Sequence, residues 1–239
     1  MSLTPRRSWI KNIINRCGRW LAGFLLFTVV VVLLLRWVPP IASALMMENE
    51  VASWFSPDHH SIDYQWVSID KMSPLVGVAV VAAEDQTFAD HFGFDWKAIA
   101  KAIHYNEKHR KKIKGASTIS QQTAKNMFLW TGRSWARKGV EVYFTLLIET
   151  LWSKERILEV YLNIIELGDG VYGVEAASQK YFHKSAKNLT SSEAALLAAV
   201  LPNPHLFKVD APSAHVRQRQ AWILQQMRQL GGKEYVETL

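Results

Sequence analysis

A pair of carboxylates follows an uninterrupted apolar run in the first half of the chain. Glu84 and Asp85 come directly after residues 75–83, which contain no polar side chain. Such a run predicts partial burial of Glu84 and a raised pKa, as a proton-accepting carboxylate requires. If the helix continues, Phe88 and His91 share a face with Glu84, because the spacing is i, i+4 and i+7. The alternative is an amphipathic helix with solvated acids.

A second group of polar residues follows Gly115. Thr118, Gln122 and Lys125 have the same i, i+4, i+7 spacing and would place a hydroxyl, an amide and an ammonium in one stripe. A glycine-led loop that enters a helix offers free N–H groups, which with a lysine can hold a phosphate. The Gly-Lys-Ser/Thr ending of a P-loop is absent from this segment. The alternative is a polar helix face that is only solvated.

A third group places several cations near one acid. Arg137 and Glu141 are spaced i, i+4, and a surface ion pair is the simplest interpretation. The same acid is crowded in sequence by three further cations, Arg133, Lys138 and Lys125. Four cations near one carboxylate suit the binding of a diphosphate.

The net charge of +7 is unevenly distributed along the chain. Residues 1–40 hold six basic residues and no acid, which leaves 22 basic and 21 acidic residues in the remainder. Between residues 97 and 138, eleven Lys and Arg stand against one acid. A basic strip on a nearly neutral body indicates an anionic ligand, and we expect no nucleic acid as partner. The single cysteine, Cys17, cannot form an internal disulfide.

Residues 20–38 are predicted to form a transmembrane helix. From 21 to 35 only Thr28 is polar, and Trp20 and Trp37 flank the run as interface anchors. Basic residues precede the helix, so residues 1–19 are expected to be a cytoplasmic arm, with the body outside the cytoplasm at the bacterial inner membrane. The alternative is a signal peptide cleaved after Ala44, which also leaves the body outside.

The rest of the chain reads as a linker, residues 39–73, followed by one mostly helical domain, residues 74–239. Alternating apolar residues at 62, 64 and 66, after a turn at 56–58, predict a short strand before this domain. We expect Gly93 to close one helix and Asp95 to cap the next. Further helix starts are predicted at Thr118, Ser134, Ser153, Thr190 and Ser213.

Five ordered motifs resemble those of the peptidoglycan glycosyltransferases, glycosyltransferase family 51. They are residues 84–88 with His91 and Gly93, residues 115–126, Arg137-Lys138 with Glu141, residues 154–163, and residues 170–177 with Tyr181-Phe182. Ala116 and Ser120 depart from the family's usual glycine and threonine. The length remaining after the motifs leads us to expect the monofunctional, membrane-anchored form, without a transpeptidase domain.

The resemblance implies an all-α, lysozyme-like fold with minor β structure at its start and two lobes around a cleft. It implies inverting polymerisation of lipid II into glycan strands, with Glu84 as general base and Glu141 organising cations or ligating a metal. The implied substrate-binding residues are Asp85, Phe88, His91, Ser117, Thr118, Gln121, Gln122, Lys125, Asn126, Arg133, Arg137, Lys138 and Lys154. No tightly bound cofactor is expected, although a divalent cation, Mg or Mn, is a candidate.

The expected partners are lipid II, the growing lipid-linked glycan and the membrane, with other cell-wall synthesis proteins as further candidates. Two other functions remain open from the sequence. A muramidase or lytic transglycosylase shares the fold but cuts a neutral glycosidic bond, which needs no diphosphate site. A non-catalytic protein that binds anionic lipid would use the basic residues between 108 and 114, but would leave Glu84 and Glu141 without a role.

Overall fold

The computed structural model describes residues 5–55, 61–109, 114–132 and 134–239, which form two compact units, 1–38 and 39–239. The predicted turn at 56–58, Arg133 and the basic residues 110–112 therefore lie outside the described residues. The chain is mostly helical, with one small sheet, as the sequence predicted.

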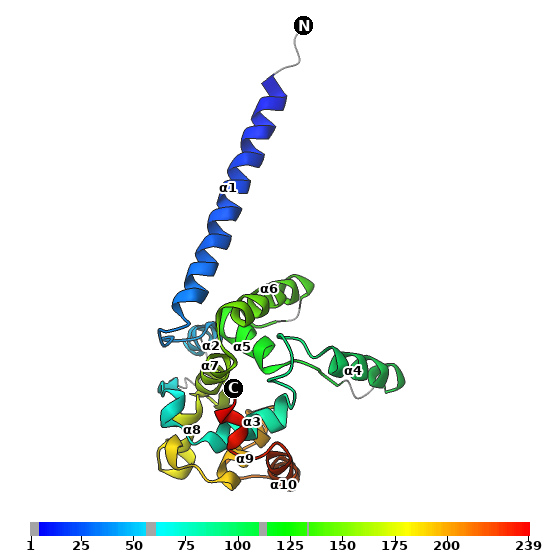
Figure 1. The fold of residues 1–239 in the computed structure, drawn as a ribbon. Coiled ribbons are helices and arrows are strands. Elements are labelled where there is room, and N and C mark those ends of the chain that lie inside the picture. The colour runs from blue at the N-terminus through cyan, green and yellow to red at the C-terminus, as the bar shows by residue number, and fades with distance from the viewer. Residues whose placement is uncertain (1–4, 56–60, 110–113, 133) are drawn as a thin grey trace. The chain divides into compact units, whose positions relative to one another are not determined.

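The first unit is a single long helix, α1 (Pro5–Leu34) (Figure 1). Its segment Asn12–Leu34 has a mean hydropathy of 2.2 and is long and apolar enough to cross a membrane. The predicted transmembrane helix was 20–38. The observed helix begins earlier, within the basic arm, and ends earlier, at Leu34. Beyond Leu34 the chain turns through Arg36 and Trp37, and the prolines at 39 and 40 cannot continue a helix.

The second unit begins with a helix that the sequence analysis did not predict. Helix α2 (Ala44–Ser53) starts at Ser43, whose hydroxyl accepts a hydrogen bond from the backbone N–H of Met46. The sequence predicted a linker here, and the structure shows why the apolar pattern is weak, since Met46 is the one residue of this helix that is buried.

The small sheet confirms the strand expected before the domain. Strand β1 (Asp63–Tyr64) pairs in parallel with β3 (Val171–Tyr172), and β2 (Glu166–Gly168) pairs antiparallel with β3. Gly173 follows β3 with φ of 82°, and a Cβ there would lie 2.5 Å from the carbonyl oxygen of Asn163. The sheet thus joins the start of the unit to its fifth sequence motif.

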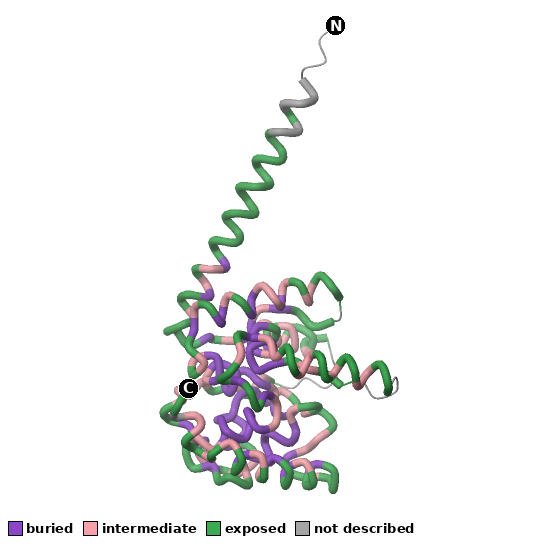
Figure 2. The backbone as a smooth tube through the Cα atoms, turned by 45° about the vertical axis from the view of Figure 1, so that its right-hand side comes forward, coloured by how far each residue is buried: buried purple, intermediate pink, exposed green. Residues whose placement is uncertain are grey.

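One group of helices packs around α3 (Pro74–Glu84). Helices α9 (Ser191–Val200), α10 (Ala214–Gln229) and the short α11 (Glu234–Glu237) surround it. Residues 76–82 are all buried, which explains why the run is apolar on every side rather than amphipathic. Figure 2 shows this buried centre of the unit.

A second group packs around α5 (Ile119–Phe128). Helices α6 (Trp135–Leu151), α7 (Lys154–Ile164) and α2 contact it. Helix α8 (Val174–Phe182) lies against the sheet, and single 3₁₀ turns occupy Ile69–Lys71 and Ala186–Asn188. The predicted helix caps Asp95, Thr118, Ser134, Ser153, Thr190 and Ser213 are all confirmed.

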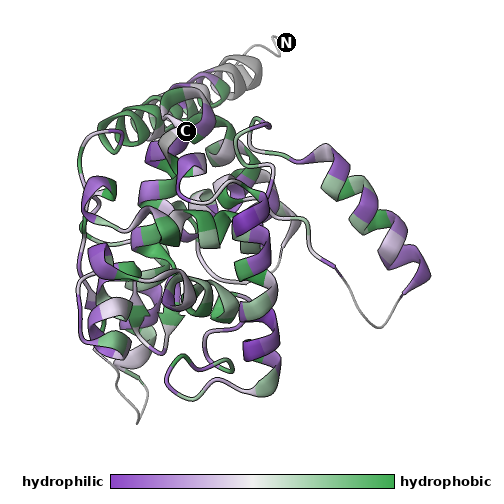
Figure 3. Ribbon diagram, turned by 60° about the horizontal axis from the view of Figure 1, so that its bottom comes forward, coloured by the Kyte–Doolittle hydropathy of each residue, from purple (hydrophilic) through white to green (hydrophobic). Residues whose placement is uncertain are grey.

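Helix α4 (Trp96–Lys108) stands apart from both groups, as Figure 3 shows. None of its thirteen residues, all of them described, is buried, and Trp96 and Ile103 are exposed.

Two local predictions were wrong. Helix α3 ends at Glu84, so Phe88 and His91 do not continue its face. Asp85 leaves the helix with φ of −159°, and its carboxylate instead bonds to His91 and to the backbone of Ile119. No helix closes at Gly93, which has φ of 78° in an irregular segment packed against Thr145.

Candidate active site

Glu84 lies at the end of α3 and lines a cavity of about 830 Å³. One carboxylate oxygen accepts a hydrogen bond from Gln122 Nε2 at 3.0 Å, and the other lies 3.3 Å from Nη2 of Arg219. Burial raises the pKa of Glu84, an effect opposed by the Gln122 hydrogen bond and by the positive charge of Arg219. The predicted partial burial and raised pKa are therefore confirmed.

Gln122 is held in a defined orientation by Tyr161. The Tyr161 hydroxyl donates to Gln122 Oε1 at 3.1 Å, which directs the amide nitrogen toward Glu84. Tyr161 is fully buried on α7, and burial raises its pKa well above the ordinary value, so it stays a donor. Glu84 is thus presented as an acceptor to the cavity.

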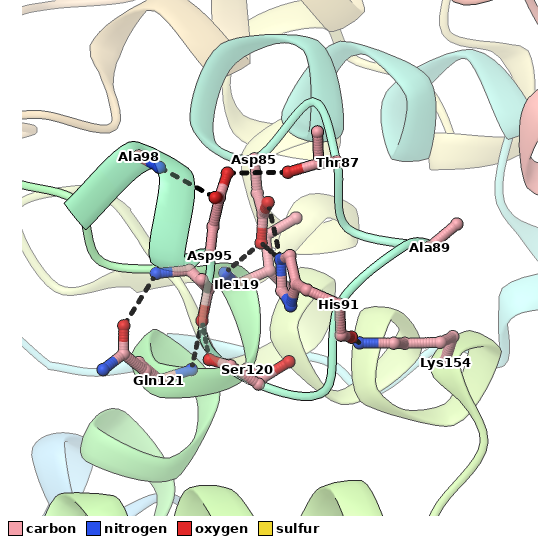
Figure 4. Close-up of polar contacts among 12 residues, drawn as sticks. Asp85, Thr87, Ala89, His91, Asp95, Ala98, Ile119, Ser120, Gln121 and Lys154 are labelled. Atoms are coloured by element: carbon pink, nitrogen blue, oxygen red, sulfur yellow. Dashed lines mark hydrogen bonds and ion pairs between the residues drawn. The ribbon is translucent and has the colours of Figure 1, made fainter. Parts of the chain in front are cut away.

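Asp85 and His91 shape the loop that follows Glu84 (Figure 4). Asp85 Oδ1 and Oδ2 lie 3.0 and 3.1 Å from His91 Nε2, and Oδ2 accepts from Ile119 N at 3.0 Å. Asp85 also lines the cavity, but both its oxygens have protein partners. The pair therefore ties the end of α3 to the start of α5.

The start of α5 forms another wall of the cavity. Thr118 and Ser117 line it, and Thr118 donates to the Gly93 carbonyl at 2.7 Å. Gln121 forms the predicted capping box with Thr118 and is itself buried. Ser117 and Thr118 can meet a ligand in the cavity, whereas Gln121 holds the helix end in place.

Phe88 and Lys154 lie in the interior, and neither lines the cavity. Phe88 is fully buried, with the Lys154 ammonium 4.6 Å from its ring. Lys154 donates to the His91 carbonyl at 2.6 Å and to Glu149 at 2.8 Å, and Ser120 also donates to Glu149. Glu149 is not among the predicted site residues, because in the sequence it lies among apolar residues in an ordinary helical pattern.

The cations of the third motif gather beside a second cavity of about 350 Å³. Lys125, Asn126 and Arg137 line it, together with apolar residues Leu45, Leu129 and Trp130. Glu141 is buried and bound to Arg137 at 3.2 Å and to Lys138. The predicted pair is therefore no surface ion pair.

Lys125 makes no ion pair with any residue that the structure describes. Burial by the surrounding protein lowers its pKa, although the side chain reaches solvent; Glu141 opposes this effect, and Arg137 and Lys138 add to it. Counted with Glu141, the three cations leave a net charge of +2 at this cavity. An anionic ligand would balance that charge.

Each carboxylate oxygen of Glu141 contacts a cation, Oε2 that of Arg137 and Oε1 that of Lys138. Within the described ranges, no group of three or more His, Cys, Asp or Glu side chains is placed to hold a metal ion.

Arg219 also lines this cavity and is not among the site residues predicted from the sequence. It lies 135 residues from Glu84 in the chain, on α10. Nothing in the local sequence distinguishes it from Arg217 on the same helix.

Comparison with known proteins identifies the family of the chain. The family model described as transglycosylase matches residues 48–228. A biosynthetic peptidoglycan transglycosylase of Cronobacter sakazakii is 57% identical over 232 residues, which cover 97% of this chain and 92% of the relative. Proteins of the same name from Shigella dysenteriae serotype 1 and Escherichia coli K12 are each 58% identical over 233 residues, 97% of this chain and 93% of theirs. The chain therefore belongs to the transglycosylase family, as its five motifs predicted.

Proposed function

We propose that the chain polymerises lipid II by transferring the lipid-diphosphate-linked glycan to the 4-hydroxyl of an acceptor lipid II, with inversion at the anomeric carbon. Membership in the family makes it a peptidoglycan glycosyltransferase. The positions of Glu84 and Lys125 support their roles as general base and as ligand of the diphosphate. The first is a partly buried carboxylate in one cavity, and the second is a cation in another that makes no ion pair with the described residues; Gln122, three residues before Lys125 on α5, binds Glu84.

Glu84 has the properties of a general base for this reaction. A sugar hydroxyl is too weak an acid to ionise before attack, so a carboxylate must take its proton as the new bond forms. Burial raises the proton affinity of Glu84, while Gln122 and Arg219 favour its ionised form. Glu84 is therefore more basic than a solvated carboxylate, and it has two neighbours that support its ionised form.

The leaving group gains negative charge as the bond to the anomeric carbon breaks. Lys125 lies three residues after Gln122 on α5, about 4.5 Å further along the helix. Arg137 lines the same cavity, and Lys138 joins it at Glu141. These cations would stabilise the departing lipid diphosphate.

Glu141 would keep Arg137 and Lys138 together. Without a counter-charge, two cations bound to one site would repel each other and separate. Because both oxygens of Glu141 are in use, no step here depends on a divalent cation, and the Mg or Mn ion considered from the sequence stays an expectation.

The long apolar helix α1 fits attachment to a membrane, which a lipid-linked substrate requires. The excess of basic residues before its apolar part supports a cytoplasmic amino terminus and an extracytoplasmic body at the bacterial inner membrane. Contacts with other cell-wall synthesis proteins remain an expectation.

The test is incubation of the purified full-length protein with labelled lipid II. Polymerisation predicts longer glycan strands and release of the lipid diphosphate, with none from Glu84→Gln. Shortening of added glycan strands would instead indicate a hydrolase or lytic enzyme. Binding without product would indicate the non-catalytic lipid-binding protein.

A further inference from the structure

Arg219 reaches the carboxylate of Glu84 from a helix outside the five motifs. Its Nη2 lies 3.3 Å from Glu84 Oε1 and 3.5 Å from the carbonyl oxygen of Ala83. The side chain is 26% exposed, and Nε is buried without a hydrogen-bond partner in the described part of the chain. A buried guanidinium nitrogen without a hydrogen-bond partner costs free energy, and such costs are common where a group serves function.

The two donors to Glu84 come from different helices and bind different oxygens. Gln122 on α5 holds Oε2 at 3.0 Å, whereas Arg219 on α10 approaches Oε1 at a longer distance of 3.3 Å. Charge-assisted hydrogen bonds are usually 2.7–2.9 Å long. Oε1 is therefore the less tightly bound oxygen, close to a positive charge but free enough to accept a proton from substrate.

Several charged groups surround Glu84, and some of them raise its pKa while others lower it. Burial raises its pKa, and the adjacent carboxylate of Asp85 raises it further. Arg219 and Lys125 lower it, with Arg219 the stronger of the two. The other titratable groups near this site include Tyr161 on α7, which stays neutral, and Lys101 of α4, which lines the same cavity. Asp95, the N-cap of α4, lines it too, and the hydrogen bond from the backbone N–H of Ala98 lowers the pKa of Asp95.

We propose that Arg219 is a positioning residue that keeps the Glu84 carboxylate ionised and turned toward the acceptor hydroxyl. The inference rests on the proposed role of Glu84 as base. Arg219 acts through Glu84 rather than on the sugar, so its removal changes the pH at which the enzyme works as well as its rate.

The experiment compares the full-length protein in detergent with Arg219→Met, Arg219→Lys and the control Arg228→Met. Arg228 lies on the same helix and is exposed. The measurement is kcat for lipid II polymerisation between pH 5 and 9. A positive charge as close to a carboxylate as Arg219 is to Glu84 lowers the carboxyl pKa by about 1 to 3 units. Because Arg219 is partly exposed to solvent, we expect a shift of about 1 unit.

Arg219→Met should therefore move the midpoint of the acidic limb upward by about one pH unit, with much of the lost rate recovered at high pH. Arg219→Lys should restore part of the shift, and Arg228→Met should match the wild type. A uniform fall at every pH with an unchanged midpoint, or a rise in KM alone, would overturn the inference in favour of a structural or substrate-binding role.

A second measurement does not depend on turnover. Carbodiimides react with protonated carboxyls, so mass spectrometry of the peptide that contains Glu84 reports its protonation. At pH 6, Arg219→Met should show more modification of Glu84 than the wild type, and equal modification would contradict the inference. If Glu84→Gln retained polymerisation, the base assignment itself would fail. If Glu84→Gln were inactive while Arg219→Met kept the wild-type profile, only the role of Arg219 would fail.

Discussion

Replacement of Lys125 by alanine tests whether the cationic cavity is a specific diphosphate site. Lys125 is the one cation of the described cluster that is not committed to Glu141, so it is free to bind a ligand. Its removal lowers the net charge of the cluster from +2 to +1. Arg137 and Lys138 cannot move to replace it without leaving Glu141, which is buried.

The size of the effect follows from the lost contact. A hydrogen bond to a charged group contributes about 1.5 to 3 kcal/mol, which corresponds to a rate loss of about 10- to 150-fold. The assay is kcat/KM for lipid II polymerisation by full-length protein in detergent, repeated over a series of salt concentrations. At physiological salt the loss for Lys125→Ala should lie in this range, and it should shrink but persist as salt is added, because the side chain lines the cavity but also reaches solvent.

Lys108→Ala is the matched control. Lys108 belongs to the same basic strip, is exposed at the end of α4 and lines neither cavity. Exposed charges are screened beyond about 8 Å at physiological salt, so its loss should change the rate less than about twofold. Equal, mild losses in both variants that disappear in high salt would refute the specific site and indicate general attraction to anionic lipid.

Four further predictions concern the two carboxylates, the buried Phe88 and the membrane segment. Glu84→Gln should lose about 10²- to 10⁴-fold in polymerisation rate. Because burial raises the pKa of Glu84, ionisation of Glu84 destabilises the folded protein as the pH rises above about 4.5. The variant should therefore have a higher Tm than the wild type at pH 8, and the difference in Tm should shrink toward pH 4. Glu141→Gln should lose activity by releasing Lys138 and Arg137, and titration with a non-reactive diphosphate lipid should show that binding is retained more than turnover. Phe88→Ala should destabilise the protein by about 3 to 5 kcal/mol in chemical unfolding, whereas Phe88→Leu should keep most of the activity, because the ring is buried and does not line the cavity. A reporter that works only outside the cytoplasm, fused after residue 60, should be active and membrane-bound, whereas a soluble, shortened product would indicate cleavage after Ala44.

The features that the sequence predicted correctly depend on contacts between residues close together in the chain. The Thr118–Gln121 and Thr190–Glu193 capping boxes form between residues three apart, so their helix starts can be read directly. The apolar run before Glu84 predicted its partial burial, because a helix with apolar residues on every side is buried by other elements all around it. The order of the five motifs predicted the family.

The features that the sequence could not predict depend on partners far away in the chain. Helix α3 ends at Glu84 because Asp85 bonds to Ile119, 34 residues later, in place of continuing the helix. The Lys154 ammonium donates to the carbonyl oxygen of His91, which lies 63 residues earlier in the chain.

Arg219 shows the same limit most clearly. Its contact with Glu84 spans 135 residues and exists because α10 packs against α3. Local patterns encode where a helix starts and which side of it is buried, since these depend on neighbouring side chains. Which charge faces the catalytic carboxylate depends on how the helices pack, and therefore only the tertiary structure decides it.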